Sequence, residues 1–209
     1  MTINWTGLNI LDFIAATFVA LLLWFLDKQK KPHLTIGEAQ SSELDLPQGK
    51  YKIVNLKVKN DRKSGLTSKF FNQTATQVRA SIIFKDFESK NKLFELIGRW
   101  NTTREPLTPD YSKADPGLAL TSQREVISPG EEITLSIAIK KDKSNKCFPF
   151  NNESYLHLPD FSKPEWELSD DKILVSVKIQ SAEIETDEIN FILINKSVLS
   201  QFSISSNKN

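Results

Sequence analysis

The apolar stretch from Leu8 to Leu26 constrains this chain more than any other segment does. A helix of this length spans about 28 Å, close to the roughly 30 Å hydrocarbon core of a bilayer. From Phe13 to Leu26 the stretch carries no charged residue. The sequence therefore predicts a single transmembrane helix at residues 8–26, preceded by a short N-terminal tail at residues 1–7.

Two other interpretations compete with a membrane anchor. A secretory signal peptide has a basic start and a small-residue cleavage site, whereas this stretch has no Lys or Arg before it and ends in LLLWFLDKQKK. A buried core helix usually keeps a polar stripe, and this stretch is apolar on all faces after Asp12. Asp12 lies about one turn from the helix start, where its carboxylate can reach headgroups and water. These features favour a retained anchor.

Lys28, Lys30 and Lys31 come directly after the apolar stretch and are our candidate lipid contacts. Because basic residues near a membrane helix stay on the cytoplasmic side, they predict a single-pass protein of the cell membrane with its large domain in the cytoplasm. Glycosylation sequons give the opposite indication and occur at Asn4, Asn72, Asn101, Asn152 and Asn195. The sequon is short and its count rises with Asn, Ser and Thr content, so we give the lysines more weight.

Composition favours one domain without a nucleic-acid role. The chain has 209 residues, and the part after the apolar stretch is long enough for one well-filled domain. Its 27 basic and 26 acidic residues nearly cancel, which gives no electrostatic reason to expect nucleic-acid binding. Cys147 is the single cysteine, so it can form no intrachain disulfide.

Four segments show the alternation of apolar and polar residues that is typical of half-buried strands. In the first, YKIVNLKVKN, the apolar residues Val54, Leu56 and Val58 alternate with polar ones. Three further segments alternate in the same way at 78–84, 133–139 and 173–179, and weaker strand candidates lie at 93–100, 124–127 and 191–194. Seven or eight strands are therefore expected, and Ile137 should face the core.

Turn residues are frequent between these strands, and helical periodicity is absent outside the N-terminal stretch. The expected fold class is mainly β: an immunoglobulin-like antiparallel β-sandwich behind one N-terminal transmembrane helix. We expect a linker with a first short strand at 27–49, the β-sandwich domain at 50–196 and a C-terminal tail at 197–209. The loops 101–123 and 140–166 are long, and such loops are either functional or disordered.

No catalytic, metal-binding or cofactor-binding pattern is present. The seven glycines are never closer than twelve residues apart, which excludes the phosphate loops that need clustered glycines. The two histidines, His33 and His157, lie far apart in the chain and do not suggest a zinc site. Cys147 and His157 share a long loop, but Cys147 beside Phe148 is typical of a small packed hydrophobe. We therefore expect no enzyme, no cofactor and no metal.

A basic run, Lys140, Lys141, Lys143 and Lys146, comes after the strand at 133–139. It is typical of a solvated hairpin tip. The alternative is contact with an anionic leaflet, which requires this loop to face the bilayer.

The combination of YKIVNLKVKN, VRASIIFKD, the Gly98–Trp100 segment GRW, ISPGEE and CFPFNNESY is similar to a known group. It resembles uncharacterised prokaryotic membrane-anchored proteins with a β-sandwich domain, in which an R-A strand, an R-W pair and an N-N-E-S-Y loop recur. The resemblance covers about residues 50–195. It implies a β-sandwich behind an anchor and no substrate.

Five residues form the candidate interaction surface. An aromatic side chain beside a guanidinium and a polar loop that ends in Tyr are common in recognition surfaces. They are also common in a structural corner in which a buried Trp is braced by an Asn-rich loop, and we favour this second interpretation. The residues are Arg99, Trp100, Asn151, Asn152 and Tyr155.

The sequence thus favours a membrane-anchored protein-binding or scaffold module, held by membrane lipid through residues 8–26. Its expected partner is a protein, and a homo-oligomer is compatible with the same pattern. The alternative is a membrane-anchored sensor or effector whose β domain binds a small ligand. A deep pocket with convergent polar groups favours the ligand, and an exposed apolar patch on a sheet face or edge favours the protein partner.

Overall fold

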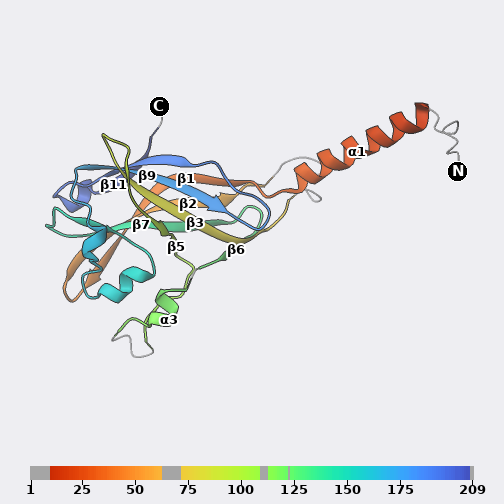
Figure 1. The fold of residues 1–209 in the computed structure, drawn as a ribbon. Helices are drawn as coiled ribbons and strands as arrows, with labels where there is room; N and C mark the ends of the chain where they lie inside the picture. Colours follow the sequence, from red (N-terminus) through yellow and green to blue (C-terminus); the bar gives the residue numbers. More distant parts are fainter. Residues whose placement is uncertain (1–9, 63–71, 109–112, 122, 208–209) are drawn as a thin grey trace, which may run out of the picture.

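The computed structural model describes residues 10–62, 72–108, 113–121 and 123–207, without the side chains of 10, 11 and 27–29. Two antiparallel sheets pack face to face as a β-sandwich, with one helix projecting from it (Figure 1). The expected mainly β sandwich is confirmed. The predicted tail at 1–7, together with Leu8 and Asn9, lies outside the described residues.

The first sheet has the order β1-β2-β7-β5, and β8 pairs with β7 beyond β5 along the same strand. Its outer strand β1 forms a hairpin with β2 and has no partner strand in this sheet on its other side. The strands are β1 Leu34–Leu46, β2 Gly49–Asn60, β7 Glu132–Lys141, β5 Arg99–Trp100 and β8 Cys147–Pro149.

The second sheet has the order β11-β10-β9-β3-β4, and β6 continues the line of β4 along β3. Its edge strands are therefore β11 on one side and β4 with β6 on the other. The strands are β11 Ser203–Ser206, β10 Ile189–Ile194, β9 Lys172–Gln180, β3 Ala75–Asp86, β4 Lys92–Ile97 and β6 Glu125–Ile127.

The core lies between the sheets and contains the alternating residues of the four strongest predicted strands. Val54, Leu56 and Val58 of β2 are fully buried, and Ile137 of β7 is 1% exposed. Their partners across the sandwich come from β3 and β9 and belong to the same hydrophobic cluster. The four strands and the inward face of Ile137 are confirmed.

Gly98 carries the chain from one sheet to the other. It lies between β4 in the second sheet and β5 in the first, which the sequence had suggested as one continuous strand. A Cβ atom at this position would lie 2.5 Å from Cδ1 of Leu135 and 3.1 Å from Cβ of Ala80. Only glycine therefore fits where the crossing strand passes between the two sheets.

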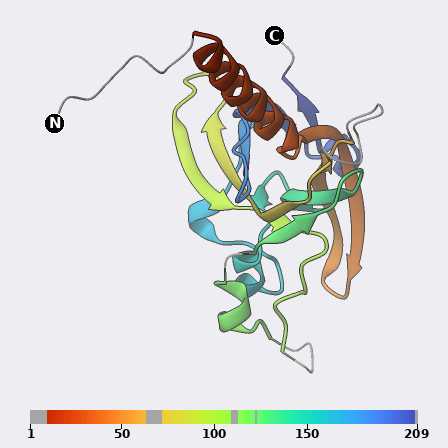
Figure 2. The ribbon, with the colours of Figure 1, turned by 90° about the vertical axis from the view of Figure 1, so that its right-hand side faces the viewer.

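The long loops contain short helices and a second, smaller aromatic cluster. Helix α3 (Pro116–Ala119) and the 3₁₀ helix η1 (Glu153–His157) lie side by side beneath the sheets (Figures 1 and 2). Two further 3₁₀ helices are η2 (Pro164–Trp166) and η3 (Leu199–Gln201). The cluster consists of Tyr51, Ile139, Phe150, Tyr155 and Phe161.

Two segments differ from the expected linker and tail. The first strand, expected to be short, extends through the polar sequence EAQSSELDL, because β1 is an edge strand whose residues 38–43 are exposed on both faces. Strand β11 lies within the expected C-terminal tail, where Phe202 and Ile204 are buried in the core. Residues 38–43 of β1 lack the alternation of a half-buried strand, and the alternation around β11 contains only Phe202 and Ile204, which is too short to predict a strand.

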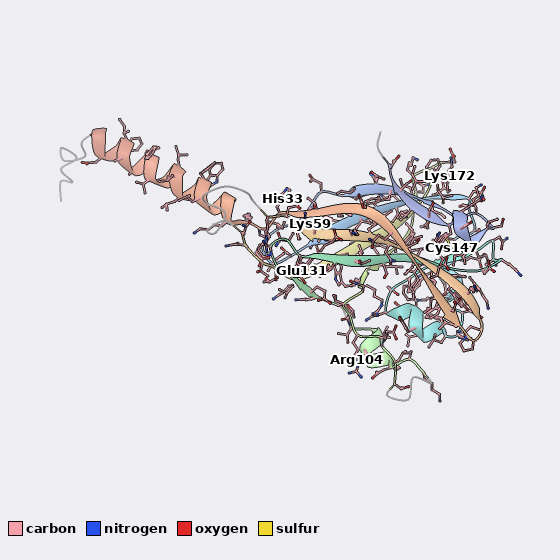
Figure 3. All side chains as sticks on the ribbon, turned by 180° about the vertical axis from the view of Figure 1, so that it is seen from behind. His33, Lys59, Arg104, Glu131, Cys147 and Lys172 are labelled. Carbon is pink, nitrogen blue, oxygen red and sulfur yellow. The ribbon has the colours of Figure 1, made fainter. Side chains whose placement is uncertain are left out.

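Helix α1 (Ile10–Lys30) points away from the sandwich (Figures 1 and 3). Its side chains from Asp12 to Phe25 are exposed. Across the described residues no helix is both long enough and apolar enough to cross a membrane, so the span predicted at 8–26 is not found there.

The basic run after β7 is not uniformly solvated. Lys140 is 1% exposed, and its ammonium group donates a hydrogen bond to the Asn195 side chain. Cys147, the cross-strand partner of Lys140, lies at the end of the sandwich away from α1, whereas His33 lies at the end next to α1 (Figure 3). The interpretation of the whole run as a solvated tip is therefore wrong for Lys140.

Candidate functional site

The structure places the five predicted surface residues in one region but buries all of them. Arg99 and Trp100 form β5, Asn151 and Asn152 precede η1, and Tyr155 lies within η1. Their exposed fractions lie between 0% for Trp100 and 8% for Asn151. They form a buried, hydrogen-bonded group beneath the surface, which we call the corner. A partner would therefore contact the exposed residues around the corner.

Arg99 is the centre of this corner. Its Nη1 donates to Oδ1 of Asn152 at 2.5 Å, and its Nη2 donates to the carbonyl of Thr103 at 2.9 Å. The guanidinium also lies 5.4 Å from the centre of the Tyr155 ring, a cation–π contact. Among the described residues it forms no ion pair with a carboxylate. The planar fork of the guanidinium thus joins β5, the following loop and η1.

Tyr155 closes the corner from the side of the aromatic cluster. Its ring packs against Phe150 and Phe161, with centroids 5.6 and 5.4 Å away. Its hydroxyl donates to Oε1 of Glu105 at 3.3 Å. Burial, the largest cause, raises the pKa of Tyr155 to about 12. The phenol therefore stays protonated at neutral pH and serves as a hydrogen-bond donor.

The Asn-Asn-Glu-Ser-Tyr sequence forms a tight turn because Asn151 and Ser154 bond each other. The Ser154 amide donates to Oδ1 of Asn151, and the Asn151 amide donates to Oγ of Ser154, both at 3.1 Å. The Asn151 side-chain amide also donates to the carbonyl of Ile97 at 3.4 Å. This side-chain pattern is an Asx turn, and it ties the turn to the end of β4.

Two buried donors near this corner have no hydrogen-bond acceptor among the described residues. They are Nε1 of Trp100 and Nδ2 of Asn152. An unsatisfied buried donor costs about 1–3 kcal/mol. Asn152 therefore holds a spare donor although its Oδ1 is occupied by Arg99.

A groove lies directly over the corner, and we call it the β4 groove. It has a volume of about 230 Å³ and combines the end of β4 with α3 and the turn before η1. Leu120 is 66% exposed and Ile97 47% exposed at its walls. The groove is lined by Glu95, Leu96, Ile97, Gly98, Ala119, Leu120, Thr121, Gln123, Asn151, Asn152 and Glu153.

Helix α1 carries a second set of candidate contact residues. Lys30 and Lys31 are exposed at its junction with the sandwich, while the side chain of Lys28 lies outside the described residues. His33, Lys59 and Glu131 mark the end of the sandwich that the helix joins (Figure 3). The large apolar side chains exposed on α1 are Phe13, Ile14, Phe18, Val19, Leu21, Leu22, Leu23, Trp24 and Phe25.

A second hollow is larger than the β4 groove, is mainly polar and holds charges of both signs. It measures about 490 Å³ and contains Arg79 and Arg124 together with Glu183 and Glu185. The Glu183 carboxylate is bonded by the amide and hydroxyl of Thr76. Two arginines against two glutamates leave this hollow without a net field that would select an anion or a cation.

The residues that could supply reactive chemistry lie apart. Cys147 is buried in the main cluster, and its burial raises the pKa of the thiol to about 12, which opposes thiolate formation at neutral pH. No hydrogen bond joins it to His157 in the described part of the chain. Over the same residues, no group of three or more His, Cys, Asp or Glu side chains is placed to hold a metal ion.

The fold and these sites define an antiparallel β-sandwich protein with a projecting apolar helix. No family model, no curated protein and no solved structure matches the chain. Sequence patterns predicted the residues of the corner but missed the β4 groove. The exposed residue Ile97, set in the alternation of LFELI, was the available signal for it.

Proposed function

We propose that this protein is a β-sandwich held at a membrane by helix α1 and acts there as a protein-binding or scaffold module. One observation carries the membrane part. Nine large apolar side chains on α1 are exposed, from Leu22 at 45% to Phe13 at 70%. Moving such side chains from water into lipid is worth on the order of 10 kcal/mol in total.

The exposed apolar surface beside the β4 groove supports a protein partner over a small ligand. Pockets that bury small ligands usually measure about 300–1,000 Å³, and the groove, at about 230 Å³, is below that range. It suits one or two side chains of a partner. The larger hollow is mainly polar, and Ala182 and Ile184 are its apolar lining residues, which give it less apolar surface than such ligands usually contact.

The location and the fold family are part of the same proposal. Exposed Lys30 and Lys31 favour attachment to an anionic leaflet, with the sandwich on the cytoplasmic side. The two antiparallel sheets support an immunoglobulin-like sandwich, and kinship with prokaryotic membrane-anchored proteins is proposed from the R-W pair and the N-N-E-S-Y loop. No catalytic role forms part of the proposal.

Flotation with lipid vesicles tests the membrane part. Full-length protein should float with vesicles of phosphatidylcholine and phosphatidylglycerol, and Phe18→Asp combined with Leu22→Asp should abolish flotation. The matched control is Leu156→Asp with Val198→Asp, two exposed apolar residues outside α1, which should float as the wild type does. Equal flotation of both double variants would exclude α1 as the attachment.

A further inference from the structure

Strand β4 presents an unpaired edge to the β4 groove. In an antiparallel pair, alternate residues bond the partner strand. The Gly98 amide donates to the Ala80 carbonyl at 2.9 Å. Two residues earlier in the same register, the backbone groups of Leu96 therefore also point toward β3. The backbone groups of Glu95 and Ile97 therefore point to the opposite side, where none of the described strands pairs with them.

A hydrogen bond at the end of β4 supports this assignment. The Ile97 carbonyl accepts from the side-chain amide of Asn151, which approaches from the unpaired side. The amide of Ile97 and both backbone groups of Glu95 have no hydrogen-bond partner among the described residues and can bond a further strand. Such an edge is a ready template for strand addition.

The groove at the end of this edge supplies side-chain contacts. The side chains of Ile97 and Leu120 are exposed at its walls, and Leu96 and Ala119 add apolar surface. Asn152 lines the same groove and keeps a donor without an acceptor among the described residues. An extended chain on β4 would thus find backbone partners along the edge and an apolar seat beyond it.

The charges around the groove select the kind of chain. Glu95 and Glu153 are the ionisable residues among the described lining residues. Glu95 lies 2.7 Å from Lys92 in an exposed pair, which exchanges partners readily, and Glu153 lies 2.7 Å from Lys163 in a partly buried pair. Lys92 lowers the pKa of Glu95, which keeps the carboxylate charged. A Lys or Arg of an incoming chain is favoured here, and an Asp or Glu is repelled.

We propose that β4 and its groove bind an extended segment of a protein partner, with apolar and basic side chains in alternation. This inference rests on the proposed protein-binding role and names its site and its partner class. The segment adds a strand to the edge of the second sheet, seats an apolar side chain between Ile97 and Leu120, and pairs a basic side chain with Glu95 or Glu153.

The other long edge strand, β1, is less suited to strand addition. The exposed residues of β1 from Glu38 to Glu43 are polar apart from Ala39, and none of them lines the β4 groove or the larger polar hollow. Natural proteins protect edge strands with polar and charged residues of this kind. The contrast with Ile97 and Leu120 assigns the strand-addition site to β4.

Fluorescence anisotropy with a defined probe tests this site. The probe is a labelled eight-residue peptide of alternating Val and Lys, titrated against the full-length protein in non-ionic detergent. Ile97→Pro removes the amide donor of the open edge and leaves the bonds to β3, whereas Ile97→Ala keeps that donor. We expect Ile97→Pro to weaken binding at least tenfold more than Ile97→Ala does.

Charge variants provide the second arm and keep the test valid if Ile97→Pro misfolds. Glu95→Gln with Glu153→Gln should weaken binding at least threefold, while Glu88→Gln, an exposed residue at the turn after β3, should leave it unchanged. A matched peptide of Val and Glu should not bind. Undetectable binding of the Val–Lys peptide, or equal binding of the Val–Glu peptide, overturns the site even if vesicle flotation succeeds.

Discussion

Arg99 donates a 2.5 Å hydrogen bond to the side chain of Asn152, a residue 53 positions further along the chain. This bond joins the short strand β5 to the turn before η1, and the same guanidinium bonds the carbonyl of Thr103. The floor of the β4 groove is therefore set by a buried cation whose partners are an amide oxygen, carbonyls and an aromatic ring.

Replacing Arg99 should destabilise the protein. Arg99→Met leaves the Thr103 carbonyl and the Asn152 oxygen without their donor, and we expect a loss of about 2–4 kcal/mol in the free energy of unfolding. Arg79→Met removes an exposed arginine with a single bond to Gln180 and should cost less than about 1 kcal/mol. Urea unfolding of the full-length protein in detergent measures both. Equal midpoints would contradict a bracing role for Arg99.

Gly98→Ala should overpack the core at the point where the chain passes from β4 in the second sheet to β5 in the first. The new Cβ would meet Cδ1 of Leu135 at 2.5 Å, and we expect a loss of about 1–3 kcal/mol. Gly37→Ala, whose nearest neighbour would be 3.9 Å away, is the control and should change stability by less than about 1 kcal/mol. Adding Leu135→Ala to Gly98→Ala should cost less than the sum of the single changes. Strict additivity in this double-mutant cycle would show that the two residues do not collide.

Stability should fall in alkaline solution because Cys147 and Tyr155 resist ionisation only when folded. Burial raises the pKa of Cys147 from 9.0 to about 12 and that of Tyr155 from 10.0 to about 12. Their stabilising contribution is full below pH 9 and is lost as the pH rises from 9 to about 12, because the unfolded chain releases these protons first. For Cys147 this amounts to about 4 kcal/mol. Burial lowers the pKa of Lys140, which opposes the loss in part.

Chemical unfolding at about pH 8–11 tests this dependence. In Cys147→Ala the free energy of unfolding should fall less steeply with pH above about pH 9 than in the wild type. The difference between the two slopes should reach up to about 1.4 kcal/mol per pH unit, whatever the stability of the variant at about pH 8. Tyr155→Phe should flatten the curve above about pH 10 in the same sense. Parallel curves for the wild type and Cys147→Ala would mean that this thiol titrates normally in the folded protein.

We expect the orientation of the domain to depend on the lysines after the apolar segment. We predict that protease added to intact cells leaves the sandwich uncut and that Asn72 and Asn101 carry no glycan. Changing Lys28, Lys30 and Lys31 to Glu should weaken attachment to anionic vesicles, since each lysine near the surface contributes about 1 kcal/mol. A glycan on Asn101 would place the sandwich on the other side of the membrane.

The strongest strands were predictable because each has one face in the core. Val54, Leu56 and Val58 alternate in the sequence and are all fully buried, and Ile137 faces inward as expected. Strand β1 was missed in part because both of its faces are exposed along residues 38–43. The split between β4 and β5 depends on how closely Gly98 approaches Leu135, which is a contact between sheets and leaves no local pattern.

The sequence predicted which residues gather at the candidate site but not which of them are exposed. The R-W pair and the N-N-E-S-Y loop were recognisable, but whether they point outward or inward depends on which elements cover them. The structure buries Arg99, Trp100 and Tyr155 and exposes Ile97 and Leu120 beside them. Periodicity does not reveal an unpaired edge, because the pairing of β4 is decided by strands distant in the sequence.

Carbonate extraction of native membranes tests most directly whether α1 holds this protein at a membrane. Alkaline carbonate releases proteins that are bound only at the surface and leaves inserted ones in the pellet. We predict that the full-length protein stays in the membrane pellet and that Phe18→Asp with Leu22→Asp moves it to the supernatant, while Leu156→Asp with Val198→Asp leaves it in the pellet. Release of the wild-type protein into the supernatant would contradict insertion of α1.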